Sequence, residues 1–112
     1  MDDWVAFLSA RLAEDADLAT ACGCDGEWAA HGHTVDFCVT DLPGFVPRFA
    51  EHVARHDPAR VLREVAAKRR VLKRHAPGPR GACRADGSRW PCAEIRDLAA
   101  PFADHPDFPR RY

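Results

Sequence analysis

Cysteine and histidine residues bracket a long segment near the C-terminal end of the chain. His75 and Cys83 come first, Cys92 follows, and His105 lies in the tail. Zinc prefers thiolate and imidazole ligands in a tetrahedron, and a metal would order a segment with few apolar residues. The separation of Cys83 from Cys92 exceeds the about two to four residues of a zinc knuckle. The alternative is that Cys92 is a small apolar residue in the first turn of a helix, and that the histidines are polar surface groups.

Two further sets of residues offer metal ligands. His52 and His56 are four residues apart, so on a helix they project side by side and could replace ligands of the first site. A Cys-x-Cys string is followed by a His-x-His string where a turn and a hairpin would let ligands converge. These four residues are Cys22, Cys24, His31 and His33. The alternative is that they are ordinary loop residues beside a buried Cys38.

The number of cysteines and the absence of long apolar runs indicate the cellular compartment of the protein. Five cysteines are an odd number, which favours thiols or metal ligands over a disulfide framework. No apolar stretch approaches the roughly 18 residues that a membrane span needs, and the chain opens without a basic and apolar leader. The expectation is a cytoplasmic protein that does not enter a membrane.

One helix carries a concentrated positive charge although the whole chain has a net charge of only -1. Basic side chains recur at steps of three and four residues between positions 60 and 74, opposite an apolar stripe. We call this set the basic face: Arg60, Arg63, Arg70, Lys73 and Arg74. Such a face stays in water and attracts an anionic partner, which is a protein or another acidic surface in our interpretation. The alternative is a solvated face with acidic partners elsewhere in the chain, which is the commoner explanation of such a pattern.

Nucleic acid is the alternative partner. The basic residues could follow phosphates, and two helices joined at Asp57-Pro58 have the outline of a helix-turn-helix. The start of the second helix, however, lacks the Asn, Gln or Ser that would read bases. A small nucleic-acid-binding regulator is therefore the second hypothesis.

Catalysis is the third hypothesis. Cys92 at a helix N-terminus could act as a nucleophile with His105 or His75 as its base, and His56 adjoins Asp57. No nucleophile elbow, glycine-rich phosphate loop or pair of carboxylates accompanies these residues. We therefore assign no catalytic residue and keep a thiol- or metal-dependent enzyme as an alternative.

The periodicity of apolar residues predicts the elements that position these groups. Helices are expected over 3–21, 46–55, from the cap at 57 to about 75, and from 91 until Pro101 breaks the last one. Two strands, 27–30 and 34–40, should form a hairpin around Gly32, with Val35, Phe37 and Val39 on its buried side. A long loop over 76–90 and a tail over 103–112, anchored by Phe102, Phe108 and Tyr112, complete the chain.

These elements predict an α+β protein, mainly helical, folded as a small single domain over residues 1–112. About four helices would surround the core, with the short β-hairpin between the first and second helices. The predicted core residues are Trp4, Leu8, Leu12, Phe49, Val53, Leu62, Val65, Leu72, Ile95 and Leu98.

Three strings of the sequence resemble one family: MDDWVAFLSARLAEDADLA at the start, HVARHDPARVLREVAAKRRVLKRHA in the middle, and CAEIRDLAAPFADHPDFPRRY at the end. The family comprises small proteins of actinobacteria and their phages and is catalogued as a domain of unknown function. The segment 22–45 and the loop 77–89 lie outside the resemblance. The resemblance implies a soluble, single-domain protein in a prokaryotic or phage setting, and it supplies no catalytic residue.

The sequence therefore favours a non-catalytic interaction module. Its basic face would bind a protein or another acidic surface, and a structural zinc ion would hold the loop. Nothing in the sequence sets the oligomeric state.

Overall fold

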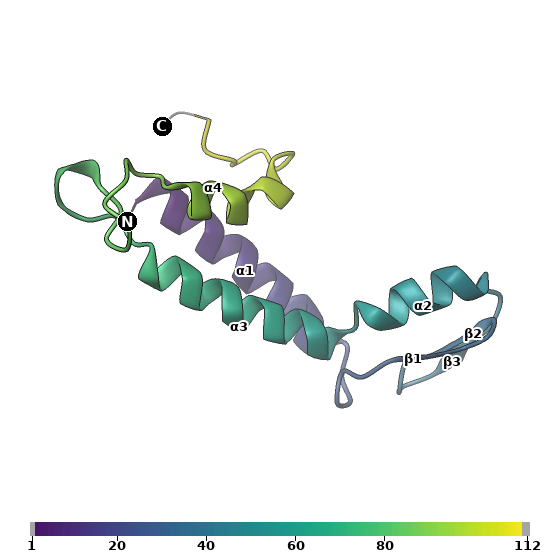
Figure 1. Cartoon of the computed structure of the whole chain (residues 1–112). Coiled ribbons are helices and arrows are strands. Elements are labelled where there is room, and N and C mark those ends of the chain that lie inside the picture. The colour runs from purple at the N-terminus through teal and green to yellow at the C-terminus, as the bar shows by residue number, and fades with distance from the viewer. Residues whose placement is uncertain (1, 111–112) are drawn as a thin grey trace. The chain divides into compact units, whose positions relative to one another are not determined.

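The structure is a computed structural model, and it describes residues 2–110. These residues form four α-helices and a small sheet, which confirms the predicted α+β class (Figure 1). The elements in chain order are α1 (Asp3–Ala21), β1 (Ala29–His31), β2 (Thr34–Asp36), β3 (Asp41–Leu42), α2 (Pro47–Arg55), α3 (Pro58–Arg74), the 3-10 helix η1 (Pro79–Gly81), α4 (Ala93–Ala99) and the 3-10 helix η2 (Ala100–Phe102). Within residues 2–110, no helix combines the length and the apolar character that crossing a membrane requires.

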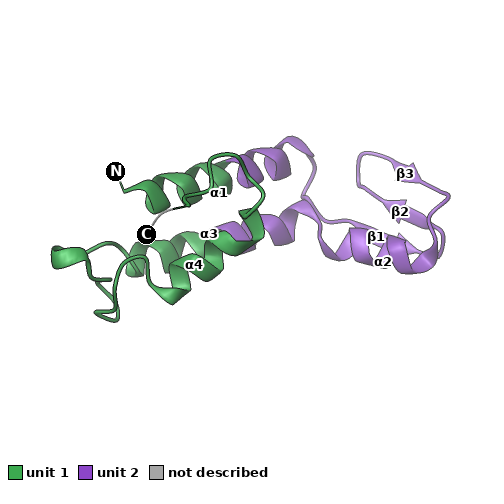
Figure 2. Cartoon of the chain, turned by 90° about the horizontal axis from the view of Figure 1, so that it is seen from above, with its two compact units in different colours: residues 1–13, 66–112 green, residues 14–65 purple. Residues whose placement is uncertain are grey.

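The chain divides into two compact units. Unit 1 comprises residues 1–13 and 66–112, and unit 2 comprises residues 14–65 (Figure 2). The helices α1 and α3 each contribute residues to both units. The units are described separately below.

The first helix begins where local chemistry predicts. The Asp2 carboxylate accepts hydrogen bonds from the backbone N–H groups of Trp4 and Val5 at 2.9 and 3.2 Å. It thereby satisfies two donors that an α-helix leaves unpaired in its first turn. The helix ends at Ala21, and Gly23 follows with a φ of 75°, the left-handed conformation that glycine tolerates best. The predicted range of α1 is confirmed.

Unit 1 holds the main apolar core. Trp4, Phe7 and Leu8 of α1 are buried together with Leu72 of α3 and with Ile95 and Ala99 of α4. The aromatic rings meet edge to face, because that arrangement sets the positive edge of one ring against the negative face of another. Phe7 and Phe108 have centroids 5.5 Å apart at 84°.

The C-terminal tail packs on this core through Phe102 and Phe108. Pro101 lies in η2, directly after α4 ends at Ala99, so the predicted break of the last helix is confirmed. That helix begins at Ala93 rather than at Pro91, because Cys92 takes the extended conformation of an N-cap. Tyr112, the third predicted anchor, lies outside the described residues.

Unit 2 contains a three-stranded antiparallel sheet in the order β1-β2-β3, with α2 packed on β1 and β2. Ala30 pairs with Val35, and His31 pairs with Thr34 across Gly32, so the predicted hairpin is present. Its predicted bounds were wrong. The strand β2 ends at Asp36 because the chain turns there: the N–H of Phe37 donates to the carbonyl of Thr40 at 2.9 Å. Val39, predicted to be buried, is 66% exposed.

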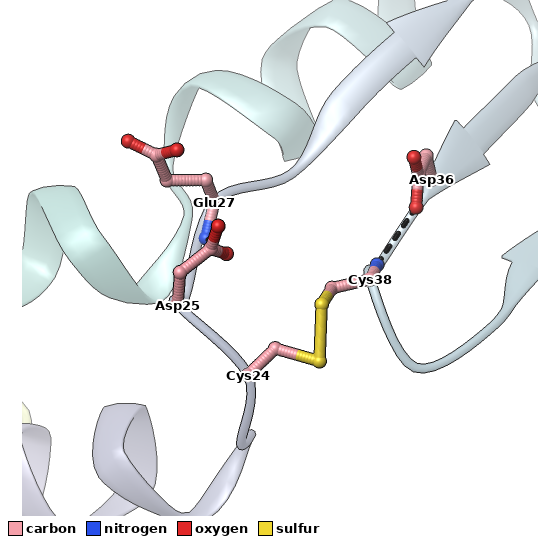
Figure 3. Close-up of a disulfide and its surroundings, with 5 residues drawn as sticks. All are labelled: Cys24, Asp25, Glu27, Asp36 and Cys38. Atoms are coloured by element: carbon pink, nitrogen blue, oxygen red, sulfur yellow. Dashed lines mark hydrogen bonds between the residues drawn. A yellow bond between two sulfur atoms is a disulfide. The ribbon is translucent and has the colours of Figure 1, made fainter.

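A disulfide between Cys24 and Cys38 closes this turn onto the segment before β1 (Figure 3). Cys38 has a φ of 72°, and its N–H donates to the Asp36 carboxylate at 2.8 Å. The aspartate thus fixes the turn that directs Cys38 toward Cys24. The expectation that all five cysteines are thiols or metal ligands was wrong for this pair, because tertiary folding brings together residues 14 positions apart.

The junction between α2 and α3 follows its predicted chemistry. The Asp57 carboxylate accepts from the N–H of Arg60 at 2.8 Å, which caps α3, and Pro58 occupies the first helical position. The same carboxylate also accepts from the N–H of Trp28 at 3.2 Å. Asp57 therefore joins the helix start to the segment that leads into β1.

Two predicted core residues of unit 2 are exposed. Phe49 is 62% exposed and Leu62 is 39% exposed, whereas Ala50 is completely buried. The helix α2 contacts the sheet through a side that includes the small Ala50, so Phe49, one position earlier, faces solvent. Of the other predicted core residues, Val65 is buried and Val53 is half-buried.

Candidate metal centre

Four potential ligands converge in unit 1: His75, Cys83, Asp86 and Cys92. His75 directly follows α3, Cys83 and Asp86 lie in the long loop, and Cys92 is the N-cap residue of α4. Each residue offers one ligand atom, and all of these atoms lie within 4.8 Å of one another. Within residues 2–110, this is the only such group of three or more His, Cys, Asp or Glu residues.

Backbone hydrogen bonds hold the loop that carries two of the ligands. The N–H of Cys83 donates to the carbonyl of Ser88 at 2.7 Å, and the N–H of Gly87 donates back to the carbonyl of Cys83 at 2.9 Å. Gly87 has a φ of 73°, which this tight return requires. The Asp86 carboxylate accepts from the N–H and the hydroxyl of Ser88 at 2.9 and 2.6 Å. The loop therefore presents Cys83 and Asp86 in a fixed relation.

The two sulfur atoms are equidistant from one imidazole nitrogen. Nδ1 of His75 lies 3.5 Å from Sγ of Cys83 and 3.5 Å from Sγ of Cys92. A neutral imidazole nitrogen has one lone pair or one proton, so it forms a good hydrogen bond with only one of these thiols. The nearest oxygen of Asp86 lies 3.9 Å from the same nitrogen. This arrangement provides two sulfur, one nitrogen and one oxygen donor for a metal ion.

Burial differs among the four ligands. Cys83 and Cys92 are 2% and 1% exposed, whereas the side chains of His75 and Asp86 are 16% and 43% exposed. Burial raises the pKa of the Cys92 thiol, and neighbouring Cys83 adds to this effect. Hydrogen bonds from the side chain and backbone of Ser88 hold the pKa of Asp86 below its ordinary value. Burial thus favours the thiol form of Cys92, and the hydrogen bonds favour the carboxylate form of Asp86.

The raised pKa of Cys92 disfavours its role as a nucleophile. Reactive cysteines have a lowered pKa, because the thiolate is the attacking species. Here, despite its place at the start of α4, burial outweighs the backbone hydrogen bond that lowers the pKa. A metal ion would reverse this preference, because bound thiols lose their protons.

His105 does not join the group that was predicted from the sequence. Its Nδ1 accepts from Arg11 at 3.1 Å and from the N–H of Asp107 at 3.0 Å, and its ring packs on Phe7. His105 therefore fixes a turn of the tail. Asp86 lies at the site instead. The sequence did contain a signal for Asp86, because two residues separate it from Cys83, a common spacing of zinc ligands.

The alternative ligands His52 and His56 lie side by side on α2 and just after it. Their ring centroids are 4.4 Å apart, as the four-residue spacing predicts. Nδ1 of His56 donates to the carbonyl of His52 at 2.7 Å. Both residues belong to unit 2, and within residues 2–110 they are part of no larger ligand group.

The cluster predicted from the Cys-x-Cys and His-x-His strings does not assemble in the described part of the chain. Cys24 is bonded to Cys38, and the exposed Cys22 donates from its sulfur to the carbonyl of Leu18 at 3.4 Å. His31 is exposed, and Nδ1 of His33 lies 2.8 Å from the carbonyl oxygen of Phe45. The disulfide and these local hydrogen bonds involve three of the four residues, Cys24, Cys22 and His33.

The basic face follows one continuous helix, α3. Nε of Arg60 pairs with the carboxylate of Glu64 at 2.8 Å, and a second nitrogen of Arg60 donates to the carbonyl of Arg55. The other four cations are exposed, and none of them forms an ion pair with a residue in the range 2–110: Arg63, Arg70, Lys73 and Arg74.

Comparison with known proteins identifies a family. The family model described as a family of unknown function (DUF6221) matches residues 1–112. The chain belongs to this family. The match includes the segment 22–45 and the loop 77–89, which the three sequence strings left out, so Cys83 and Asp86 lie within the family's span. No curated protein and no solved structure gives a significant match to the chain.

Proposed function

We propose that the chain is a non-catalytic interaction module whose unit 1 is stabilised by a zinc ion. The observation that carries the zinc site is the pair of 3.5 Å distances from Nδ1 of His75 to the two sulfurs. Ligands at the usual Zn–N and Zn–S lengths, placed at a tetrahedral angle, lie about 3.6 Å apart. The imidazole nitrogen therefore already lies at the separation from each sulfur that zinc requires.

The ligand set favours zinc over magnesium or calcium. Magnesium and calcium select oxygen ligands, whereas thiolate and imidazole suit zinc. Four protein ligands would fill the tetrahedron, which is typical of structural sites, because catalytic sites keep one position open for water. Asp86 decides between a structural and a catalytic site. It is the most exposed of the four ligands, so its position is the one that water would take if the carboxylate does not bind the metal.

Metal analysis tests the zinc site. Protein purified without a chelator should contain zinc in a stoichiometric amount, and Cys83→Ser and Cys92→Ser should abolish it. Cys22→Ser is the matched control, because Cys22 is an exposed thiol outside the group. His105→Ala should also retain zinc. Wild-type protein without stoichiometric metal would overturn the proposal.

The role of Asp86 has its own test. Asp86→Asn should lower zinc affinity about 10- to 100-fold if the carboxylate is a ligand, a loss similar to that seen when groups around metal sites are changed. Unchanged affinity, together with metal-dependent hydrolytic activity, would instead favour a site with an open position and the enzyme alternative.

We propose that the basic face supplies the binding surface. Arg63, Arg70, Lys73 and Arg74 are solvated cations without carboxylate partners in the described part of the chain. Their charges attract an acidic protein surface and speed its association. The net charge of the whole chain, -1, gives no overall attraction to nucleic acid, so a protein with an acidic surface is the favoured partner.

Charge reversal tests the surface. The double variant Arg70→Glu/Arg74→Glu should lose salt-sensitive binding to polyglutamate, used as a probe of acidic protein surfaces. Arg84→Glu is the control, because Arg84 is an exposed loop cation outside the basic face. Salt-sensitive binding to duplex DNA that exceeds binding to polyglutamate would favour the nucleic-acid regulator.

We propose a cytoplasmic location for the zinc-bound form. A reducing compartment keeps Cys83 and Cys92 as thiols that are available to the metal. The exposed Cys24–Cys38 disulfide would be reduced in that compartment. Acid trapping of intact cells followed by alkylation should find Cys24 and Cys38 reduced, whereas full oxidation of the pair would contradict this location.

A further inference from the structure

We propose that a groove in unit 1 docks an acidic peptide segment of a partner protein, and that the groove takes one apolar side chain of that segment. This inference rests on the proposed function, and it names the part of the surface that makes partner binding specific. The groove has a volume of about 550 Å³. Its apolar lining is formed by Val5, Leu72, Ala76 and Pro77.

Three separate stretches of unit 1 form the groove. The start of α1 contributes Val5 and Ser9, the end of α3 contributes Leu72, and the loop after His75 contributes Ala76 and Pro77. Leu72 is 8% exposed and also belongs to the core of unit 1. A volume of this size is in the range of ligand pockets and accommodates a leucine or phenylalanine side chain.

The charged groups at the groove leave it cationic. Arg69 and Lys73 line it four residues apart on α3, both are exposed, and neither has an ion-pair partner in the described residues. Asp2 also lines the groove, but both of its carboxylate oxygens already accept hydrogen bonds within unit 1. One caps α1, and the other accepts from the indole N–H of Trp90 at 2.9 Å. Carboxylates of a bound peptide are therefore the natural partners of Arg69 and Lys73.

The lining favours a peptide over a nucleic acid. Proteins bind single-stranded nucleic acids by stacking bases on aromatic side chains, and this groove has no aromatic lining residue. An amphipathic peptide matches both features, because it places an apolar anchor in the groove and charges at the rim. Val5, Ala76 and Pro77, which are half-buried, then gain burial that a phosphodiester chain would not provide.

The groove is connected to the metal centre. Ala76 and Pro77 directly follow the ligand His75, and the carbonyl of Ala76 accepts from the N–H of Arg84 at 2.9 Å. Pro77 also forms a β-bridge with Cys83, a second ligand. A metal ion held by His75 and Cys83 would thus fix one wall of the groove, and removing the metal should weaken peptide binding.

A displayed library of random short peptides, selected on immobilised zinc-loaded protein, tests the groove. Enriched peptides should combine Asp or Glu with one Leu, Ile or Phe. Arg69→Glu/Lys73→Glu should weaken these peptides by about tenfold or more, because attraction at the rim becomes repulsion. Ser9→Trp should block them by filling the groove, and circular dichroism with zinc content should confirm that each variant folds.

Arg63→Glu is the matched control, because Arg63 belongs to the basic face but not to the groove lining. If Arg63→Glu weakens binding as much as the rim variant, the groove is wrong but the proposed acidic-surface binding remains. The proposed docking groove is overturned if the selection yields no acidic peptides. It is also overturned if the selected peptides bind equally well to Arg69→Glu/Lys73→Glu and to Ser9→Trp. Salt-sensitive binding of duplex DNA without peptide binding overturns both proposals.

Discussion

The two units of this chain bury apolar surface to very different extents. Unit 1 buries large side chains, including Trp4, Phe7 and Ile95, around one core. In unit 2 the buried side chains are small, with Val35 and Val65 the largest. Every exposed large apolar residue in the described part of the chain belongs to unit 2: Leu18, Val39, Leu42, Val46, Phe49 and Leu62.

This contrast shows two ways to hold a short segment of chain. Unit 1 combines a core with a cluster of metal ligands, whereas unit 2 joins a short sheet by a disulfide. A unit of this size gains only a thin margin of stability from burial, so a cross-link or a metal commonly adds to it. The following changes, from the largest expected effect to the smallest, test whether the two units depend on different interactions.

Removing the proposed zinc ligands should have the largest effect. Cys83→Ser should destabilise unit 1 by on the order of 5 kcal/mol, since structural zinc sites contribute about 10 kcal/mol or more of binding free energy. Amide hydrogen exchange should accelerate over residues 76–99, and residues 29–36 should keep their protection. Equal acceleration in both regions would show that the units do not depend on different interactions.

A pair of phenylalanine substitutions compares the cores directly. Phe7 is 5% exposed in unit 1, and Phe49 is 62% exposed in unit 2. Phe7→Ala should lower the free energy of unfolding by about 3–5 kcal/mol. Phe49→Ala should change it by less than about 0.5 kcal/mol. Urea unfolding of both variants measures the difference, and similar losses would contradict the contrast in burial.

Removing the disulfide should affect unit 2 selectively. Cys24→Ser/Cys38→Ser should cost about 3 kcal/mol, because a loop of this length gains that much chain entropy when it is opened. Exchange protection should fall over residues 29–36. Cys22→Ser is the control, since it removes a neighbouring free thiol. Loss of zinc from the double variant would be unexpected, because the metal ligands lie in unit 1.

Among the changes expected to destabilise the protein, loss of the cap of α3 should have the smallest effect. Asp57→Ala removes the acceptor for the N–H groups of Arg60 and Trp28. We expect a loss of about 1–2 kcal/mol, typical of an N-cap aspartate. Asp57→Asn should recover most of this stability, because its amide oxygen can still cap the helix. Thermal unfolding measures both variants, and an unchanged midpoint for Asp57→Ala would exclude the cap's contribution.

The sequence alone predicted what depends on neighbouring residues. Asp2 and Asp57 cap their helices as expected, since a cap acts within three residues. The side-by-side placement of His52 and His56 also followed from spacing. His75, Cys83 and Cys92 were predicted as a group because they bracket one loop, and the structure brings them together.

The tertiary structure decided what depends on distant contacts. The pairing of Cys24 with Cys38, the place of Asp86 beside His75 and the use of His105 in the tail all join residues whose positions are set by packing. The exposure of Phe49 was decided in the same way, because periodicity gives a helix an apolar side but does not state which side meets the sheet. Local chemistry thus set the helices and most of the ligands, and packing selected the partners.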